Sequence, residues 1–302
     1  MMPQMRILFI SDFALKHSPG GAQRSNQIIL DKATELGHVL HEMYSDSGVT
    51  LEELVKLIAE QKYDFVISSN LEVLAKVPGL IDVLSILPNH VRLEHDMNMY
   101  LTAQDRHKLY SNCAKIFFLT EYHHQRFIDN YGDFFKNVEI VSDPIDTETF
   151  RDLGEEREDV ILFSGFLHAL KGASVFINYV KSNPDKKFVC SSWGEPFFTD
   201  QLQQLENVEF IGETDYEAMP ILYNRVSSIF YKPIMDEPFC RTIGEAILCG
   251  VPNLIINDKI GCVHEMEKLG KDKFIKSCNS AAQDFWRILF SLRSFGQRDN
   301  NV

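Results

Sequence analysis

Two glutamates eight positions apart are the residues best suited to chemistry, in the stretch Glu237-Pro-Phe-Cys-Arg-Thr-Ile-Gly-Glu245. We expect Glu237 in a loop after a strand and Glu245 one to two turns into the following helix. Unpaired N–H groups at the start of that helix, together with its dipole, attract anions. The amides concerned are those of Phe239, Cys240, Arg241 and Thr242. Two carboxylates beside them suit a ligand that carries hydroxyl groups on both sides of a phosphate.

The spacing alone leaves a purely structural explanation open. Acidic residues are common near helix starts, where the helix dipole favours them. In that explanation Glu237 is a first-turn acid and Glu245 is a surface charge. The two explanations are about equally compatible with the spacing, so the surrounding elements have to decide between them.

The first half of the chain alternates between strand and helix patterns. Arg6–Asp12 is a short apolar run typical of a buried parallel strand, and a loop containing Gly20 and Gly21 follows it. Apolar residues then recur at helical spacing as far as Leu36. Further strands are predicted over 39–44, 65–68, 91–95 and 116–120, and a helix over 51–61. This alternation predicts a parallel sheet wrapped by helices.

The composition changes after a short strand at 138–141. Residues 142–159 are rich in charge and read as a linker, after which the alternation restarts. Strands are predicted over 160–164, 188–191, 208–211, 228–231 and 253–256, and helices over 173–181, 216–224, 242–249 and 281–295. We therefore predict an α/β protein with two Rossmann-like domains, 1–150 and 151–280, and a helical segment, 281–302, that packs back on the first domain. Ligands bind at the carboxyl ends of such sheets, so the two domains should face each other across a cleft.

The residues after Glu237 match a known pattern. Phe239 lies two positions after Glu237. Glu245 is followed by an alanine, by a Gly-Val-Pro turn at 250–252 and by an apolar strand. This order resembles the retaining glycosyltransferases with the GT-B fold, in particular glycosyltransferase family four. Cys240 stands where that family usually has Gly, and Arg241 stands where it usually has Leu.

Other parts of the family pattern follow in the same order along the chain. They are Gly20-Gly21, the stretch 144–150, Phe163-Ser-Gly-Phe166 with Lys171-Gly172, the stretch 208–212 and the stretch 219–223. The resemblance spans about residues 5 to 265 and is weaker in the first half. The ordered series is far more specific than any one of its motifs.

The resemblance implies a role for each matching residue on the donor side. Glu245 would accept hydrogen bonds from the ribose hydroxyls of a nucleotide, and Glu237 would hold a hydroxyl of the donor sugar. Lys171 would neutralise the diphosphate leaving group as a point charge. The backbones of Gly20, Gly21 and Gly165 would let the donor approach closely, because glycine has no side chain.

His95 is the remaining residue that the resemblance places beside the reacting sugar. It lies in Leu93-Glu-His-Asp96, at the end of a predicted strand. A single histidine is more often structural, but a strand end is where ligands bind in an open α/β sheet. We therefore favour a catalytic site role for His95, beside Lys171 and Glu237.

One departure from the family concerns the diphosphate. The family usually has an Arg where this chain has Phe166, so one of two expected cations is missing. A charge-assisted hydrogen bond to phosphate is worth about 1.5–3 kcal/mol. Either Arg241 compensates from the opposite helix or the donor binds more weakly or differently. The alternative for Arg241 is a helix residue that faces solvent.

Composition and charge exclude several function classes. Hydrophobic residues make up 45% of the 302 residues and charged residues 24%, which excludes wholesale disorder. The formal net charge is −13, from 30 Lys and Arg against 43 Asp and Glu. Such a chain lacks the basic surface expected for nucleic acid or anionic lipid as the main partner.

The location is predicted from two further features. No apolar run reaches the roughly 18–20 residues of a membrane span, and the first residues lack a signal-peptide cleavage pattern. The six cysteines are scattered without a Cys-x-x-Cys pair. This usage suggests reduced thiols in a cytoplasm.

The leading hypothesis is a transferase that moves a sugar from a nucleotide-diphosphate sugar to a hydroxyl acceptor with retention of configuration. It predicts no cofactor, and the lack of an Asp-x-Asp motif agrees with a reaction that needs no metal. Three alternatives stay open: transfer to a hydroxylated DNA base, as some phage GT-B proteins do; a non-catalytic nucleotide-sugar-binding protein; and a GT-B epimerase.

Trp193, after a predicted strand, is a candidate for lining the nucleotide pocket, although most aromatic rings belong in the core.

Overall fold

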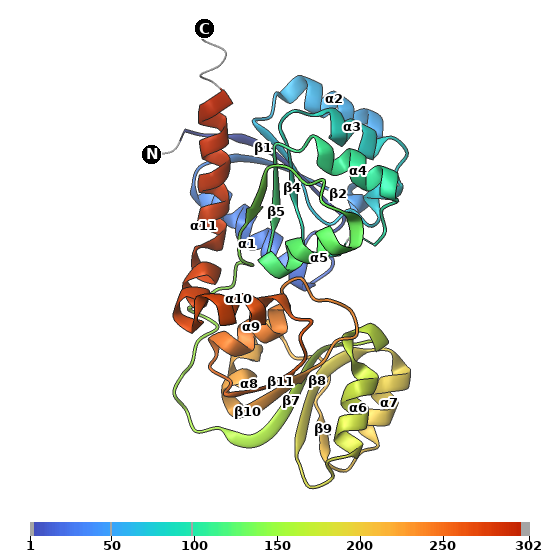
Figure 1. The fold of residues 1–302 in the computed structure, drawn as a ribbon, viewed down its shortest axis with the longest axis vertical. Coiled ribbons are helices and arrows are strands. Elements are labelled where there is room, and N and C mark those ends of the chain that lie inside the picture. The colour runs from blue at the N-terminus through green and yellow to red at the C-terminus, as the bar shows by residue number, and fades with distance from the viewer. Residues whose placement is uncertain (1–2, 49, 98, 297–302) are drawn as a thin grey trace. The chain divides into compact units, whose positions relative to one another are not determined.

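The chain forms two compact α/β units in the computed structural model, which describes residues 3–48, 50–97 and 99–296 (Figure 1). The first unit runs to Pro144 and resumes at Lys276, and the second is Ile145–Ile275. Each contains one parallel sheet with helices on both faces. The predicted α/β class with two Rossmann-like halves is therefore confirmed.

The first unit has six strands in the order β2-β1-β3-β4-β5-β6, and every neighbouring pair is parallel. The strands are β1 Arg6–Ser11, β2 Val39–Tyr44, β3 Phe65–Ser68, β4 His90–Leu93, β5 Lys115–Phe118 and β6 Val138–Ile140. The helices are α1 Gly21–Glu35, α2 Leu51–Gln61, α3 Leu80–Ile86, α4 Ala103–Ser111 and α5 Glu121–Tyr131. Three of them begin after a threonine whose hydroxyl accepts a hydrogen bond from a first-turn amide: Thr50, Thr102 and Thr120.

Alternate residues of β1 enter two separate hydrophobic clusters. Leu8 and Ile10 pack with residues of α2–α5, whereas Ile7 and Phe9 pack with residues of α1 and of the C-terminal helix. This follows from the two-residue repeat of a strand, which sends successive side chains to opposite faces. Both faces of the sheet are therefore covered, as a parallel sheet requires.

The C-terminal helix belongs to the first unit for most of its length. It is α11, Lys271–Gly296, which begins ten residues before the predicted start at 281 (red in Figure 1). Phe285, Trp286 and Leu289 are fully buried in the same cluster as Phe9. The indole N–H of Trp286 donates to the carbonyl of Ile29, at 2.7 Å. The chain thus returns to the first unit through the apolar face of this helix.

The second unit has five parallel strands in the order β11-β10-β7-β8-β9. They are β7 Glu158–Leu167, β8 Phe188–Gly194, β9 Val208–Phe210, β10 Val226–Tyr231 and β11 Asn253–Ile256. The helices are α6 Ala173–Lys181, α7 Pro196–Gln203, α8 Met219–Arg225, α9 Arg241–Leu248 and α10 Gly261–Leu269. Figure 1 shows α6 and α7 on one side of the sheet and α8–α10 on the other.

The segment between the units is anchored to the second one. Composition predicts a linker up to Asp159 and a boundary at 150, whereas the structure divides at Ile145. Phe150 is buried, with its ring 5.1 Å from that of Tyr216. The Arg157 guanidinium donates to the carbonyls of Tyr223 and Cys249, each at 2.6 Å. Charge alone therefore overstates how loosely this segment is held.

In each sheet the strand order reverses at one point, because later strands are added on the other side of the first strand. In the first unit β1 lies between β2 and β3, and in the second β7 lies between β8 and β10. Loops diverge at the carboxyl ends of such strand pairs, and ligands of open α/β sheets bind in the crevice that results. The places to look for a site are therefore the ends of β1 and β3 and the ends of β7 and β10.

Two observations bear on the predicted location. Within the described ranges, no helix combines the length and the apolar character needed to cross a membrane. All six cysteines are buried and unbridged. Burial raises the pKa of the Cys190 and Cys249 thiols to about 12, so both are protonated near neutral pH.

Candidate functional site

Lys171 and Glu237 meet at the crevice between β7 and β10. Lys171 Nζ lies 2.7 Å from Glu237 Oε1, although the residues are 66 positions apart. The Tyr231 hydroxyl donates to the same oxygen at 3.1 Å. Glu237 is 7% exposed and the Lys171 side chain 36% exposed, so the ammonium group is the wetter partner. The pair is a buried carboxylate and a more accessible cation at the predicted ligand edge.

The backbone around this pair explains why the two loops meet. Gly172 has φ +86°, and a Cβ there would lie 2.2 Å from the carbonyl oxygen of Lys232. Only glycine permits this approach of the loop after β7 to the loop after β10. Glu237 is held by its own backbone, which donates to Lys259 O at 2.8 Å and accepts from Gly261 N at 2.9 Å. Its carboxylate is therefore placed by two rigid connections.

Glu245 lies on α9, which follows the loop that carries Glu237, and it is only 4% exposed. Its Oε1 accepts from the Tyr216 hydroxyl at 3.0 Å and from Arg241 Nε at 3.2 Å, while its Oε2 lies 3.4 Å from the Tyr223 hydroxyl. Arg241 also donates to the Tyr216 oxygen at 2.8 Å. Burial, and next the charge of Glu245, raise the pKa of the Tyr216 and Tyr223 phenols, so both remain hydrogen-bond donors.

These contacts overturn the structural alternatives for three residues. A surface charge at position 245 is wrong, because that carboxylate is buried. A solvent-facing Arg241 is also wrong, because its side chain is 9% exposed and binds Glu245 four residues along the helix. Glu237 is not a first-turn acid either, since α9 begins only at Arg241.

The start of α9 has an unusual backbone. Cys240 precedes the helix with φ 73°, a left-handed conformation that costs a residue with a Cβ roughly 1–2 kcal/mol. Phe239 is buried and lies against Gly244, where an added Cβ would come within 2.7 Å of the ring. Gly165 has φ +120°, and Thr242 Oγ1 lies 3.9 Å from where its Cβ would be. The helix start and the end of β7 are therefore neighbours.

Phe166, which stands where the family usually has Arg, is a partly exposed ring. It is 44% exposed and Trp193 is 45% exposed. Their ring centroids are 6.1 Å apart, and the His168 ring stacks on Phe166 with a centroid distance of 6.2 Å. The end of β7 and β8 therefore presents aromatic surface in place of the expected cation.

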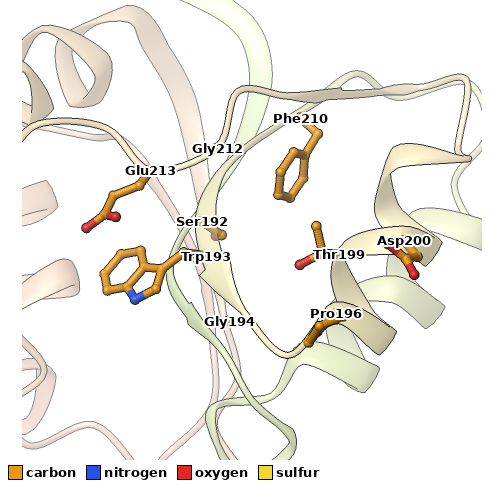
Figure 2. A pocket seen from close by; sticks show the side chains of 9 residues that line it. All are labelled: Ser192, Trp193, Gly194, Pro196, Thr199, Asp200, Phe210, Gly212 and Glu213. Carbon is orange, nitrogen blue, oxygen red and sulfur yellow. The ribbon is translucent and has the colours of Figure 1, made fainter.

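A pocket of about 370 Å³ opens beside these rings, at the ends of β8 and β9 (Figure 2). Its lining includes Ser192, Trp193, Thr199 and Glu213. The loop that carries Glu213 continues directly to Tyr216, which binds Glu245. The pocket and the Glu245 cluster thus share one loop.

The other predicted residues, Gly20, Gly21 and His95, belong to the first unit. Gly20 precedes α1 with an ordinary φ of −91°, and a Cβ there would meet only the Gln23 side chain, at 2.4 Å. His95 is 8% exposed, just beyond β4, and its Nε2 lies 2.9 Å from Asn26 Oδ1. All three lie at the carboxyl edge of their sheet, as predicted from the strand pattern.

A buried ion pair lies next to His95 in the sequence. Arg92 and Glu94 are each about 1% exposed and form a short contact with one another. The Tyr110 hydroxyl donates to Glu94 at 2.5 Å, and Arg92 donates to the Tyr100 oxygen at 3.2 Å. Paired in this way, both charges can be buried beneath the site.

Sequence reasoning missed the hydroxyl and amide partners of the predicted residues. Tyr216, Tyr223 and Tyr231 bind the two glutamates, and Asn26 binds the histidine. Tyr223 ends the matched stretch 219–223 but was given no role there, and the other three lie outside the matched motifs. The contacts join residues 6 to 69 positions apart. Within the described part of the chain, no group of three or more His, Cys, Asp or Glu could hold a metal ion.

Comparisons with known proteins bear on the fold and on the second unit. Residues 145–293 match the family model described as glycosyl transferases group 1. A search of curated proteins gives no match. Similar solved structures include Anabaena HepE in complex with UDP and glucose (16% identity, 98% of both chains covered, TM-score 0.61) and sucrose-phosphate synthase from Thermosynechococcus elongatus (11% identity, 98% of both chains, TM-score 0.67).

A third similar structure is an α-glucosyltransferase in complex with UDP and a 13-mer DNA containing an HMU base. It is 12% identical, with a TM-score of 0.60, over 97% of this chain and 100% of that chain. At these identities the likeness establishes the fold. The chain therefore has the GT-B fold, and its residues 145–293 match the family model of glycosyl transferases group 1.

Proposed function

We propose that the protein transfers a sugar from a nucleoside-diphosphate sugar to a hydroxyl-bearing acceptor, with retention of anomeric configuration and without a metal ion. The observation that carries this proposal is the Lys171–Glu237 pair, 2.7 Å apart at the crevice between β7 and β10. A cation beside a buried carboxylate suits a donor that has a diphosphate next to a hydroxylated ring. The group 1 match over residues 145–293 supports the same donor class.

Lys171 acts on the leaving group in this mechanism. When the bond from the anomeric carbon to the diphosphate oxygen breaks, negative charge grows on the diphosphate and positive charge on the sugar ring. The ammonium group of Lys171 and the amides at the start of α9 stabilise the diphosphate as preorganised electrostatics. The acceptor oxygen then bonds to the anomeric carbon on the face that the diphosphate leaves, and its proton passes to the departing diphosphate.

Glu237 and Glu245 hold the two ends of the donor. Glu237 accepts from a hydroxyl of the sugar, and the ammonium group of Lys171 lies beside this carboxylate. Glu245 accepts from the ribose, with Tyr216 and Arg241 orienting the carboxylate. The pocket beside Trp193 receives the base, because the loop that lines it continues to Tyr216. Gly20, Gly21 and His95, which belong to the first unit, keep the roles that the resemblance implies for them.

The acceptor and the location belong to the same proposal. The acceptor class is a hydroxyl of a glycan or small molecule, and a modified DNA base is the alternative to be tested. The net charge of −13 disfavours DNA, although a local basic groove can exist on an acidic protein. The cytoplasmic location predicted from the scattered cysteines suits an enzyme whose buried thiols form no disulfide.

A donor screen by thermal unfolding tests the proposal first, since a ligand of the folded state raises the midpoint according to its affinity. The stabilising donor is then incubated with acceptor alcohols, oligosaccharides and hydroxymethylated duplex DNA, and nucleoside diphosphate release is measured with and without EDTA. We expect release to fall by about 100-fold or more in Glu237→Gln and Lys171→Met, since each removes a group that acts on charge in the transition state. Lys181→Ala, an exposed lysine on α6, is the matched control.

Several outcomes separate the proposal from its alternatives. Full activity in both site variants would refute the assigned site. Tight donor binding without turnover on any acceptor indicates a nucleotide-sugar-binding protein instead. An inverted product by NMR removes the retaining mechanism, and complete loss of activity in EDTA removes metal independence. Duplex binding that is absent even at low salt removes the DNA alternative.

A further inference from the structure

A cluster of buried polar side chains lies at the other crevice, where β1 and β3 of the first unit end. Ile67 and Leu93 face the cluster that α1 and α11 cover. Ser69 and His95 follow two residues later, so the strand repeat keeps them on that same face. Asn26 reaches them from the buried side of α1. This cluster contains one residue that the function above uses, His95, and two that it does not.

The contacts within this cluster define a hydrogen-bond direction. Asn26 Oδ1 lies 2.9 Å from His95 Nε2 and 3.1 Å from Ser69 Oγ. A side-chain amide oxygen only accepts, so the ring proton of His95 must lie on Nε2. In the neutral ring Nδ1 then carries the lone pair and acts as an acceptor.

The amide nitrogen of Asn26 supplies a second, independent observation. Asn26 is 4% exposed, and its Nδ2 is buried with no hydrogen-bond partner among residues 3–48, 50–97 and 99–296. Buried donors are nearly always paired in folded proteins. This one lies at the strand ends where open α/β sheets take ligands, so an oxygen of a ligand is the partner it lacks.

We infer that Asn26 is a positioning residue for His95. Its carbonyl holds His95 in the Nε2–H form, and its Nδ2–H donates to a substrate oxygen at the same strand ends. The inference rests on the proposed sugar transfer, and it adds the residue that sets the proton position of the His95 ring. The ligand group it predicts is an oxygen that accepts from Nδ2–H, such as that of a hydroxyl.

Nitrogen-15 NMR of the histidine rings in the full chain reads the proton position directly, without any substrate. The His95 signal is assigned by its absence in His95→Gln. We expect the Nε2–H form in the wild type, its loss in Asn26→Ala, and its retention at alkaline pH in Asn26→Asp, where an oxygen still accepts. Asn89→Ala is the matched control, because Asn89 bonds the carbonyls of Tyr63 and Asp64 beside β4 at its opposite end.

Transfer kinetics with the donor from the screen give the second measurement. We expect Asn26→Ala to lower kcat by about 10- to 100-fold, since a misoriented catalytic group loses alignment with the reacting centre. Asn26→Asp keeps the ring orientation but lacks Nδ2–H, so its main effect should be a raised KM. Asn89→Ala should leave both constants near the wild-type values, even if it lowers the unfolding midpoint.

The two measurements fail independently of one another. A wild-type His95 protonated on Nδ1, or an unchanged ring signal in Asn26→Ala, overturns the role of Asn26 even in an active transferase. An unchanged kcat in Asn26→Ala overturns it as well. If no donor or acceptor gives transfer, the proposed function fails, and the ring signals alone decide whether Asn26 positions His95.

Discussion

The two units each bury a carboxylate among similar side chains. Each places a glutamate near the carboxyl edge of a parallel sheet and surrounds it with an arginine and tyrosines. In the first unit Glu94 pairs with Arg92 and Tyr110, and in the second Glu245 pairs with Arg241 and Tyr216. The resemblance ends there, because the two carboxylates differ in where their charge is needed.

Glu94 is buried between Arg92 and Tyr110. It is 0% exposed, and Arg92 beside it also donates to the backbone carbonyl of Ser69. Glu245 is 4% exposed, and the loop that leads to its partner Tyr216 lines an open pocket. The comparison suggests a structural ion pair, Arg92–Glu94, in the first unit and a ligand-binding carboxylate in the second unit.

The largest expected effect comes from breaking the pair in the first unit. Glu94→Gln leaves the Arg92 charge buried without a counter-charge, which should cost about 3–5 kcal/mol of stability. Donor affinity, measured at a temperature where the variant is folded, should stay near the wild-type value. Chemical denaturation and donor titration give the two numbers. A normal stability with lost donor binding would reverse the roles assigned to the two carboxylates.

The matching change in the second unit should mainly affect the donor. Glu245→Gln removes the charged acceptor for ribose, and a hydrogen bond to a charged group is worth about 1.5–3 kcal/mol. We expect the donor KM to rise by about 10- to 100-fold, with a smaller rise in Tyr216→Phe, which removes only a neutral donor to the same carboxylate. An unchanged KM in Glu245→Gln would contradict the ribose assignment.

The sequence predicts the frame of both units better than their polar contacts. β2, β3, β11, α2 and α6 have the bounds expected from apolar periodicity, because burial of one face is what periodicity reports. α3, α7 and α10 were not predicted as separate helices. The join also differs from the prediction, because Ile145 and Phe150 are buried although they precede a highly charged stretch.

The candidate site was predictable only as a set of residues along the chain. The motif around Glu237 and its resemblance to a family pointed to Lys171, yet their contact depends on Gly172 letting two loops meet. Tyr216 and Asn26 could not be predicted, because a buried polar partner has no periodicity or spacing of its own. The catalytic and donor-binding roles of the predicted residues stay predictions until the variants above are measured.

The smallest expected effect is a difference in acid stability between the units. Burial lowers the pKa of His90 and His123 to about 3, from an ordinary value of 6.5, and next to burial Arg92 lowers that of His90. Both histidines of the second unit, His168 and His264, are partly exposed. The first unit should therefore be the more sensitive to acid.

The sign follows from where the protons bind. Above about pH 6.5 His90 and His123 are neutral in both states and pH has no effect through them. Below it the unfolded chain takes up protons that the folded unit does not bind, so stability falls with falling pH, by about 1 kcal/mol per histidine per pH unit.

Hydrogen exchange at pH 7 and pH 5 should show β4 and β5 losing protection faster than β7 and β10. His123→Gln should reduce that difference, and His107→Gln, an exposed control, should leave it unchanged. Equal losses of protection in both sheets would mean that the buried histidines do not set the acid sensitivity of the first unit.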